Sequence, residues 1–582
     1  MSIVYDKSIS SKYKQYFEQV SNLVKPFRNY SLKEKRIIPK NITGSKSWET
    51  GQAGIPIAWN KEDKLVTVDH TDSHTLVIGP TGSKKSRLIA MPYVYILGSV
   101  GESMIISDPK AEIFNRTAFY LKEKGYDIFV LNLRSPLHGK CWNPLAIPYN
   151  FFCRGEIDKA YEFVNDIAEN LIQSGKSQSD PFWDNSAGSF FFGLVLLLFK
   201  YCKDNNKGNE YVHIGNVIQL RNVLFDKSKK QQKEYLWKYV QTDTIIAASL
   251  IGTVETAKDT QAGILSVFDQ KIRMFSIQPN LMDMLSRNDI DFAAIGNRPT
   301  AVFLITPDEK TGYHGLITLF IKQSYEYIIN MAQLNMSADE FHVGKTACRV
   351  NYLLDEFSSL PTIKDFPAMI TASRSRNIRF TLIVQSKHQL MQRYGDEAET
   401  IQTNCNNWIF LTSRELQLLE ELSSMCGKTA DNAKSVLSVA MLQRLDKEEG
   451  EALLLSERRK PCITRLPDID FYDGGHFAGV SVMAREVTEL KILDFQNLVK
   501  ENEVETEDSV QKFRNIDLDS LMADIDRKIA ELDKEEEALK RDEAKKTNPS
   551  FLMTKIDHVL DNIKKNKKEQ FFQQSRKERN HG

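Results

Sequence analysis

The sequence contains few cysteines, and none of them forms a paired motif. Its 582 residues include seven cysteines and no Cys-x-x-Cys spacing: Cys141, Cys153, Cys202, Cys348, Cys405, Cys426 and Cys462. An odd number of dispersed thiols argues against a disulfide framework and against a zinc ribbon. We therefore expect the protein to reside in a reducing compartment, the cytoplasm.

The sequence also lacks an excess of charge and an apolar N-terminal segment. Lys and Arg total 77, and Asp and Glu total 77. Any surface that attracts a polyanion must therefore be a local cluster of basic residues. Residues 1–30 show no uninterrupted apolar core like that of a signal peptide or membrane anchor. We expect neither export nor anchoring from this part of the sequence.

One apolar run raises the question of a membrane segment. Residues 188–199 read GSFFFGLVLLLF, with Asp184 before them and Lys200 after them. The run is about a dozen residues long, whereas a membrane span needs about twenty. The sequence favours a buried helix of a helical domain, and the alternative is a segment that dips into a membrane.

The length predicts two to four domains, at about 150 residues per domain. Short apolar runs alternate with helical patterns over residues 45–150 and again over residues 281–500. This alternation predicts one α/β domain with a parallel sheet. Residues 151–280 carry long amphipathic stretches instead, so we expect an all-α domain inserted into the α/β domain. Residues 1–44 form a separate N-terminal segment in this division.

The last part of the chain, residues 501–582, is polar and charged. It includes LMADIDRKIAELDKEEEALKRDEAKK and ends in the basic stretch NIKKNKKEQFFQQSRKERNHG. Opposite charges four residues apart and a thin apolar stripe are typical of an exposed or coiled helix. We expect a charged helical tail that is solvated, with contact to DNA phosphates, acidic lipid headgroups or a partner protein as the alternative.

The stretch TLVIGPTGSKKS has the form of a phosphate-binding loop between a strand and a helix. In such loops backbone N–H groups bind phosphates, the lysine reaches the β- and γ-phosphate oxygens, and the next hydroxyl ligates magnesium. Lys85 and Ser86 occupy these two positions. The predicted nucleotide-binding loop comprises Gly79, Pro80, Thr81, Gly82, Ser83, Lys84, Lys85 and Ser86.

Lys84 stands where such a loop usually has glycine. Glycine allows close approach of the backbone to phosphate and tolerates unusual backbone dihedrals. Lysine at this position either strains the turn and lowers affinity or hydrolysis, or points to solvent, or supplies a second cation. ATP turnover is therefore uncertain from the sequence alone.

An acidic pair supplies the second half of the predicted site. VNYLLDEF places Asp355 and Glu356 at the end of an apolar strand. In a P-loop enzyme the first carboxylate holds magnesium through water and the second polarises the attacking water. Asp108 and Lys110, in SMIISDPKAEIF, also follow a strand. Open α/β sheets place their ligands at such strand ends, so both are predicted to contact nucleotide, with packing or turn roles as the alternative.

These residues resemble a known family, the type IV coupling proteins (TraG/TraD-like ATPases) of conjugation and type IV secretion. The resemblance runs from about residue 44 to about residue 494. It is carried by HTLVIGPTGSKKS, SMIISDPKAEIF, NLRSPLHGKCWNPL, DPFWDNSAGSFFFGLVLLL, LLDEFSSLPTIKDFPAMITASRSRNIRFTLIVQSKHQLMQRYG and NCNNWIFLTS.

The resemblance implies a RecA-like P-loop NTPase core with an inserted all-α domain, using ATP and Mg²⁺. It also implies a homo-hexameric ring, with a monomer as the alternative for the isolated chain, and single-stranded DNA bound to a relaxase as the cargo. By motif position, Gln385 resembles the residue that senses the γ-phosphate, and Arg374 the arginine presented to a neighbouring subunit's nucleotide. Gln385 could instead cap the following helix, and Arg374 or Arg376 could be a surface ion-pair former.

The sequence departs from the family pattern in two places. Lys84 replaces the usual glycine, and residues 1–30 show no transmembrane helix, whereas family members usually begin with such helices. We therefore expect a cytoplasmic protein at the inner face of the membrane, held by a separate membrane partner of the secretion channel. The leading hypothesis is an ATP-driven DNA-transfer motor. The alternative is a nucleotide-binding docking receptor with little or no hydrolysis. A double-stranded DNA pump shares the core, but the helical insertion and the NPL and DPFW segments argue against it.

Overall fold

The computed structural model describes most of the chain between residues 53 and 495. The described residues are 27–31, 53–60, 65–173, 180–307, 309–334, 344–428, 435–457, 459–475, 478–480 and 482–495. The predicted charged tail, residues 501–582, and most of the predicted N-terminal segment lie outside them. The chain divides into two compact units, Met1–Leu493 and Asp494–Gly582, and the elements below belong to the first.

A nine-stranded sheet forms the centre of this unit, in the order β12-β11-β10-β4-β9-β8-β5-β7-β6. Every pairing from β10 to β6 is parallel, and β11 and β12 add an antiparallel edge. The predicted parallel α/β sheet is thus confirmed. The strands are β4 (Thr75–Ile78), β5 (Ser103–Ser107), β6 (Asp127–Asn132), β7 (Thr300–Ile305), β8 (Val350–Leu354), β9 (Ile378–Val384), β10 (Asn407–Phe410), β11 (Glu451–Ser456) and β12 (Cys462–Arg465).

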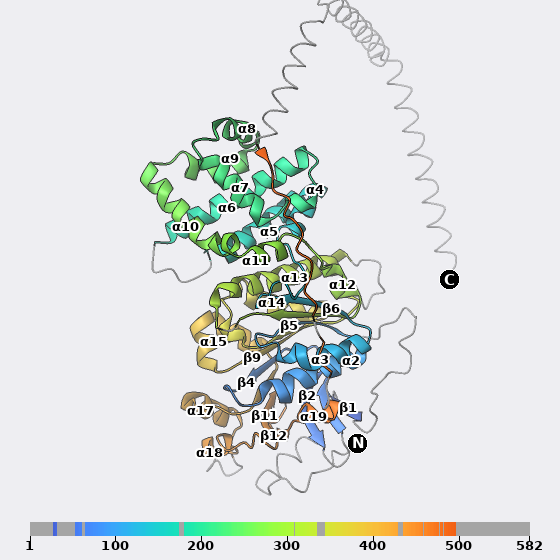
Figure 1. Ribbon diagram of the computed structural model, residues 1–582. Helices are drawn as coiled ribbons and strands as arrows, with labels where there is room; N and C mark the ends of the chain where they lie inside the picture. The colour runs from blue at the N-terminus through green and yellow to red at the C-terminus, as the bar shows by residue number, and fades with distance from the viewer. Residues whose placement is uncertain are drawn as a thin grey trace, which may run out of the picture. The chain divides into compact units, whose positions relative to one another are not determined.

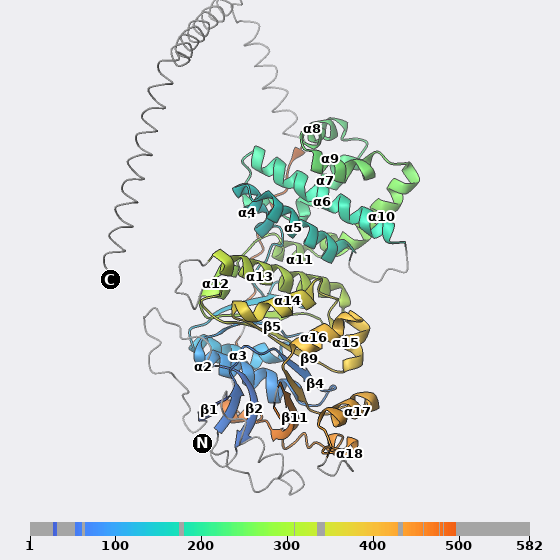
Figure 2. The same cartoon turned by 180° about the vertical axis from the view of Figure 1, so that it is seen from behind.

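Helices cover both faces of the sheet, so its central strands are buried along their whole length. Figures 1 and 2 show α2 (Met91–Val100) and α3 (Glu112–Glu123) on one face. On the other face lie α12 (Phe292–Asn297), α13 (His314–Leu334) and α14 (Phe366–Ser373). The remaining core helices are α15 (Lys387–Tyr394), α16 (Glu397–Asn404), α17 (Leu416–Met425), α18 (Val439–Leu442) and α19 (Asp470–Asp473).

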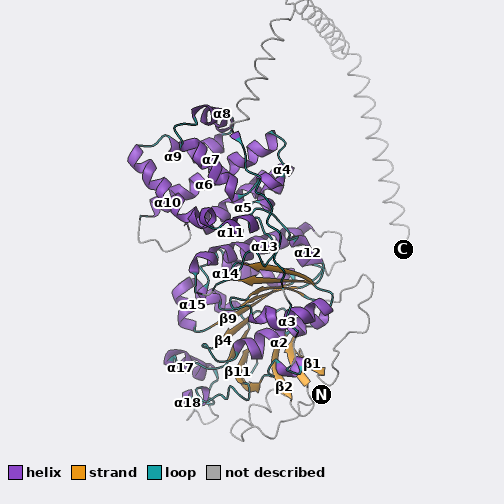
Figure 3. Cartoon of the chain, viewed as in Figure 1, coloured by secondary structure: helices purple, strands orange, loops and turns teal. Residues whose placement is uncertain are grey.

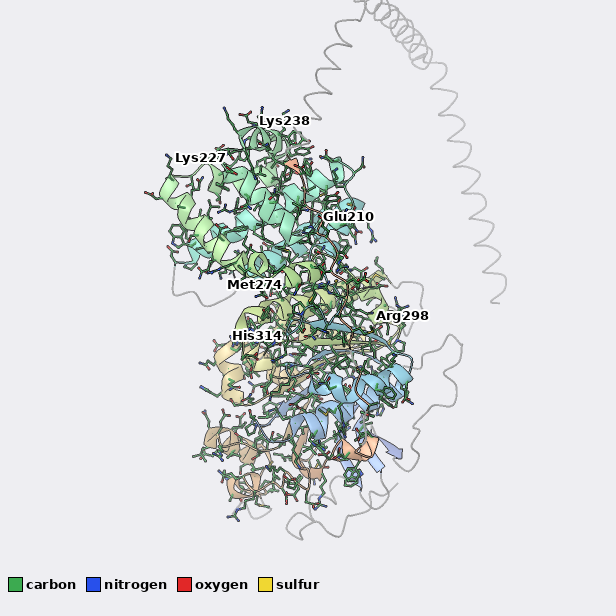
Figure 4. The ribbon with its side chains drawn as sticks, viewed as in Figure 1. Glu210, Lys227, Lys238, Met274, Arg298 and His314 are labelled. Atoms are coloured by element: carbon green, nitrogen blue, oxygen red, sulfur yellow. The ribbon has the colours of Figure 1, made fainter. Side chains whose placement is uncertain are left out.

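Between β6 and β7 the described residues form helices and no strand, as Figure 3 shows. Besides α12, which packs on the sheet, these helices are α4 (Ala146–Arg154), α5 (Ile157–Ala168), α6 (Pro181–Asp204), α7 (Ile214–Phe225), α8 (Lys230–Gln241), α9 (Thr244–Val254), α10 (Lys258–Ile277) and α11 (Pro279–Met284). The expected limits of the all-α domain, residues 151 and 280, fall inside α4 and α11. Figure 4 marks Met274 in this helical segment and His314 in the adjoining core.

The apolar run at residues 188–199 lies in α6, the central helix of this segment. Pro181 occupies the first turn of α6, and the Asp180 side chain accepts a hydrogen bond from the Phe182 N–H at 3.0 Å. Most of the apolar side chains of α6 are buried, so the expected buried helix is confirmed. Among the described helices, α6 alone is also long and apolar enough to cross a membrane, a test that buried core helices pass as well.

A second, three-stranded antiparallel sheet, in the order β1-β3-β2, was not anticipated from the sequence. Its strands are β1 (Phe27–Ser31), β2 (Ile55–Asn60) and β3 (Leu65–Asp69). They are short and lie next to charged and polar stretches, so their apolar periodicity is weak. The antiparallel edge strands β11 and β12 were also not predicted, because they too are short and lie next to charged and polar stretches.

Buried and exposed ion pairs tie the helical segment to the core. Lys322 of α13 donates to Asp166 of α5 at 2.7 Å and to Asp365, just before α14, at 3.3 Å. Lys364 pairs with Glu169 at 2.6 Å. Because Asp166 and Lys322 are both buried, losing Lys322 would leave the Asp166 carboxylate without the cation that it pairs with. The helical segment is therefore attached to the chain that follows β8.

An extended segment, residues 482–493, makes a second attachment, and its orange trace in Figure 1 passes from the core to the helical segment. The Arg485 N–H donates to the Leu137 carbonyl at 2.9 Å, and the guanidinium donates to the Asp283 carboxylate of α11. Farther along, the Leu493 N–H donates to Asn216 Oδ1 of α7 at 2.9 Å. The segment therefore bridges both parts of the unit.

A buried charge pair holds together the edge of the sheet where β5, β8 and β9 begin. Glu102 Oε2 accepts from Arg379 Nη2 at 2.5 Å and from Asn351 Nδ2 at 3.0 Å. Arg379 Nη1 also donates to the Ala53 carbonyl at 3.0 Å, which joins β2 to the core. Glu102 and Arg379 are 1% and 3% exposed as side chains.

We predict that Glu102→Ala lowers the free energy of unfolding of the core by about 3 to 5 kcal/mol, because it leaves the buried Arg379 charge without its carboxylate partner. Urea unfolding followed by tryptophan fluorescence measures the change. Asp127→Asn is the matched control, since Asp127 pairs at 3.1 Å with the exposed Arg298, which Figure 4 labels. That variant should change stability by less than about 1 kcal/mol. Equal effects of the two substitutions would contradict the prediction.

Candidate functional site

The predicted phosphate-binding loop connects β4 to the first helix of the core. It is fixed to the sheet by the Gly79 N–H, which donates to the Val384 carbonyl of β9 at 3.1 Å. Gly82 has a φ of +81°, a left-handed conformation that glycine adopts without a steric penalty. After the loop, a π-turn (Ser86–Ala90) leads directly into α2. The loop thus has the strand–turn–helix context that phosphate binding requires.

Lys84 also adopts a left-handed conformation, with a φ of +63°. For a residue with a Cβ this conformation costs about 1 to 2 kcal/mol. The side chain of Lys84 forms an ion pair with Glu448 at 2.5 Å. Of the three outcomes open from the sequence, the structure therefore combines a strained turn with a side chain turned toward an acidic partner.

Lys85 is buried within the loop that it is expected to serve. Its ammonium group donates to the carbonyl oxygens of Gly79 at 2.6 Å and Pro80 at 3.2 Å. Burial lowers the pKa of Lys85, and the nearby carboxylates of Glu356 and Asp355 oppose that shift. A buried cation within a phosphate-binding loop is suited to bind an anionic ligand.

Asp355 and Glu356 follow the last residue of β8, two strands away from β4 in the sheet. Asp355 is buried, and its Oδ1 accepts from the Glu356 N–H at 2.9 Å. Glu356 has a φ of +54°, so the backbone turns sharply at the acidic pair. Burial, and next the charge of Glu356, raise the pKa of Asp355 to about 6. A divalent cation would relieve this repulsion, which makes Asp355 a fitting metal ligand.

Gln385 follows β9, the strand that lies between β4 and β8. Its Nε2 donates to Glu356 Oε2 at 2.7 Å. The alternative role of capping α15 belongs to the neighbouring Ser386, whose hydroxyl accepts from the Gln389 N–H at 3.1 Å. The side chain of Gln385 is therefore aimed at the acidic pair.

Asp108 and Lys110 belong to the turn between β5 and α3. Asp108 Oδ2 accepts from the Phe114 N–H at 2.7 Å, so the predicted turn role is real. Burial raises the pKa of Asp108 to about 7, and the charge of Asp355 contributes to that shift. Lys110 is exposed. A turn role and a nucleotide-binding role for Asp108 are thus compatible. One carboxylate oxygen of Asp108 shapes the turn, and the residue also borders the site.

These elements surround one cavity of about 290 Å³ at the carboxyl ends of the parallel strands. It is lined by Thr81, Gly82, Ser83, Lys84, Lys85, Ser86, Arg87, Asp108, Pro109, Lys110, Glu112, Asp355 and Glu356. Gly79 and Pro80 are not among the lining residues and instead supply carbonyl oxygens to Lys85. The structure therefore brings together nearly all the residues that the sequence assigned to nucleotide and metal.

Arg374 lies apart from this cavity. It begins the short 3-10 turn Arg374–Arg376 that precedes β9, whereas Gln385 follows that strand. The seven residues of β9 span about 23 Å, so Arg374 and the cavity occupy opposite edges of the sheet. Arg374 is exposed, and Arg376 donates to the Ala372 carbonyl at 2.8 Å. Within one chain, Arg374 cannot reach the cavity.

Several residues at the site were missed by sequence reasoning. Arg87 and Glu112 line the cavity. Arg87 directly follows the loop, and Glu112 belongs to SMIISDPKAEIF, one of the stretches that carry the family resemblance, but neither was assigned a role. Glu448, the partner of Lys84, lies far away in the sequence, in a stretch without a recognisable motif. Only the three-dimensional pairing of strands brings it to the loop.

Comparison with known protein families gives a match over most of the chain. The model of the family described as Type IV secretory system Conjugative DNA transfer matches residues 24–447. Protein VirD4 of Rhizobium radiobacter is 23% identical over 401 residues, which cover 66% of this chain and 53% of that protein. For VirD4 of Agrobacterium fabrum the identity is 21% over 372 residues, covering 62% and 50%. The chain thus spans about half the length of these relatives.

Solved structures share the fold. The bacterial conjugative coupling protein TrwBdeltaN70, in an unbound monoclinic form, matches with a TM-score of 0.50 and 16% identity, covering 72% of this chain and 90% of that one. A structure of TrwB in complex with ADP and Mg²⁺ has a TM-score of 0.48 and 17% identity, covering 70% and 87%. The fold is that of a RecA-like P-loop NTPase, as predicted.

We predict that Asp355→Asn stabilises the protein at pH 8 by about 3 kcal/mol. The pKa of Asp355 is raised from 3.8 to about 6, so its contribution to stability is present below about pH 4 and is lost as the pH rises through about 6. An amide cannot ionise, and the variant should therefore gain less at pH 5 than at pH 8.

Thermal unfolding without nucleotide or metal, at pH 5 and pH 8, tests this prediction. As the control, Asp127→Asn removes an exposed carboxylate of β6 and should change stability by less than about 1 kcal/mol. A gain of equal size at both pH values, or a loss at pH 8, would contradict the assigned cause.

Proposed function

Because the chain belongs to the Type IV secretory system Conjugative DNA transfer family, we propose that it is an ATP-dependent coupling protein. In this proposal it recruits single-stranded DNA bound to a relaxase and delivers it to a type IV secretion channel. The observation that carries the proposal is the single cavity formed by the phosphate-binding loop, the acidic pair after β8 and the turn after β5.

The residues of the cavity fit Mg²⁺ and a nucleoside triphosphate. Lys85 and the N–H groups of the loop would bind the phosphates, and Ser86 and Asp355 would hold the magnesium. Bound Mg²⁺ neutralises charge that develops on the phosphates during transfer. The raised pKa of Asp355, caused by burial and by Glu356, supports this assignment, because a buried carboxylate near a like charge favours a cation.

Glu356 is proposed as the group that orients and deprotonates the attacking water. Its hydrogen bond to Gln385 fixes the carboxylate at the end of the strand next to the phosphate-binding loop. Gln385 is thereby suited to report the state of the γ-phosphate to β9. Lys110 and Asp108, across the cavity, would contact the nucleotide directly or through water.

Arg374 is proposed to act on the nucleotide of a neighbouring subunit. Its position on the opposite edge of the sheet, exposed and beyond reach of its own cavity, supports a role between subunits. A planar, permanently charged guanidinium is suited to stabilise phosphoryl charge supplied from across an interface. This arrangement requires a ring, and we propose a homo-hexamer that forms from monomers.

The proposed setting is the cytoplasmic face of the cell membrane, where the protein would be peripheral and held by a membrane partner of the channel. A docking receptor that binds nucleotide with little hydrolysis is the second candidate. It is favoured by the left-handed conformation of Lys84 and its pairing with Glu448, which place strain in the loop that binds phosphate.

Turnover of ATP separates the two candidates. For the motor we expect phosphate release by the native chain that single-stranded DNA stimulates, and similar release by Lys84→Gly. Activity that appears only in Lys84→Gly would reject the motor, whereas stimulated native activity would reject the receptor. A coupled phosphate assay with and without DNA measures both.

We predict that Glu356→Gln lowers kcat about 100-fold or more while retaining binding of Mg-ATP, because it removes the base and keeps the size of the side chain. Lys85→Ala should lose binding itself, because the phosphates lose their buried cation. Equilibrium binding of a fluorescent ATP analogue, measured beside steady-state turnover, distinguishes these effects. Normal kcat in Glu356→Gln would exclude Glu356 as the base.

The role of Arg374 is tested by mixing two inactive variants. We expect Arg374→Ala and Lys85→Ala each to be inactive alone and to regain part of the activity when mixed, since some interfaces then join an intact loop to an intact arginine. Arg376→Ala is the matched control, because Arg376 is held by its own backbone contacts, and it should remain active. Absence of recovery in the mixture, with assembly verified by sedimentation, would contradict a role in trans.

A further inference from the structure

Two residues of the phosphate-binding region, Lys84 and Arg87, form contacts with the turns at one end of the β11–β12 hairpin. In the register of this hairpin, Glu451 at the start of β11 lies opposite Arg465 at the end of β12. The Leu466 N–H donates to the Gly450 carbonyl at 2.9 Å and closes that end. The turn before β11 and the turn after β12 therefore lie side by side.

The turn before β11 contacts the loop on one side of Lys85. Glu448 pairs with Lys84 at 2.5 Å, and the two side chains are 68% and 25% exposed. The backbone carbonyl of Lys84 already accepts from the Leu88 N–H at 2.8 Å, a hydrogen bond that begins the helix. The ion pair thus attaches to the one loop residue that carries a Cβ in a left-handed conformation.

The turn after β12 contacts the loop on the other side of Ser86. Asp468 accepts from Arg87 Nε at 2.9 Å, and the Ile469 N–H donates to the Arg87 carbonyl at 3.0 Å. Asp470 accepts from Arg87 at 2.7 Å and from Arg116 of α3 at 2.6 Å. The carbonyl of Arg87 thus has a partner outside the helix, at a π-turn.

Lys85 and Ser86 therefore lie between two residues that the hairpin holds. We infer, on the premise of the nucleotide site proposed above, that this end of the hairpin positions the phosphate-binding loop, with Glu448, Asp468 and Asp470 as positioning residues. The three residues lie beyond the family match, which ends at residue 447. Glycine at position 84 would adopt the left-handed conformation without a partner. In this chain the contact of Lys84 with Glu448 stabilises that conformation before phosphate binds.

An opposite effect has to be separated from positioning. A carboxylate near bound phosphates repels them, so removal of Glu448 could tighten binding simply by reducing negative charge. This repulsion is weak for an exposed group and is screened within about 8 Å at physiological salt. It also does not depend on Lys84, whereas positioning does, because a glycine at position 84 needs no partner to adopt a positive φ.

A double-mutant cycle on Lys84 and Glu448 tests the inference. The dissociation constant of a fluorescent ATP analogue with Mg²⁺ is measured at 0.15 M salt for the native chain, Glu448→Gln, Lys84→Gly and the double variant. We expect Glu448→Gln to weaken binding about threefold to fivefold in the native background, which matches the loss of one favourable ion pair. In the Lys84→Gly background the same change should have no effect.

Glu449→Gln is the matched control. Glu449 lies in the same turn and pairs with Arg465 at 3.1 Å, away from the loop, so this variant should bind like the native chain. A second variant, Asp468→Asn with Asp470→Asn, should raise KM for ATP and leave kcat unchanged, in either background. A role confined to general stability would lower the thermal midpoint without changing KM.

Each outcome decides one question. Tighter binding in Glu448→Gln would overturn positioning and leave charge repulsion. Equal weakening in both backgrounds would overturn positioning through Lys84. If Glu448→Gln and the Asp468→Asn, Asp470→Asn variant both bind nucleotide like the Glu449→Gln control, the inference is overturned while the nucleotide site stands. Failure of the native chain to bind Mg-ATP would instead overturn the proposed function, and the inference with it.

Discussion

The parallel register of four neighbouring strands is the constraint on which the site depends. β4, β9, β8 and β5 lie next to one another in that order, with Ile78 opposite Val384, Leu382 opposite Leu354, and Leu354 opposite Ser107. Since parallel strands end at the same edge of a sheet, the turns that follow them converge. A slip of one residue in any pairing would move every side chain of that strand to the opposite face. Both faces are covered by helices, so such a slip would disrupt the packing of both layers, and this packing fixes the geometry of the site.

The same edge of the sheet is connected to the helical segment through the chain that follows β8. From Asp355 the chain passes through a short turn to Lys364 and Asp365, which pair with Glu169 and Lys322. Lys322 in turn holds Asp166 of α5. The acidic pair and α5 are thus joined by a short stretch of chain and by these ion pairs, of which Asp166–Lys322 is buried.

The sequence predicted the parallel sheet and nearly all the residues of the cavity, because each depends on a local pattern. Apolar runs ended by glycine or acidic residues identified β4, β5 and β8, and the spacing of Lys85 and Ser86 after a strand identified the loop. The three-stranded sheet and the β11–β12 hairpin were missed, since these strands are short, lie next to charged and polar stretches and show little regular alternation of apolar and polar residues. The pairing of Lys84 with Glu448 spans 364 residues of sequence, and no local rule could have indicated it.

Lys84 shows why a departure from a motif cannot be judged from the motif alone. The local rule is sound, since a Cβ at a φ of +63° is unfavourable. In the structure, however, the same substitution introduces an ammonium group, and the hairpin places a carboxylate within 2.5 Å of it. A residue that breaks a local preference at a functional site is expected to be compensated by contacts elsewhere. Here the compensating contact comes from the antiparallel edge of the sheet, so the backbone strain at position 84 and the attachment of that edge form one structural feature.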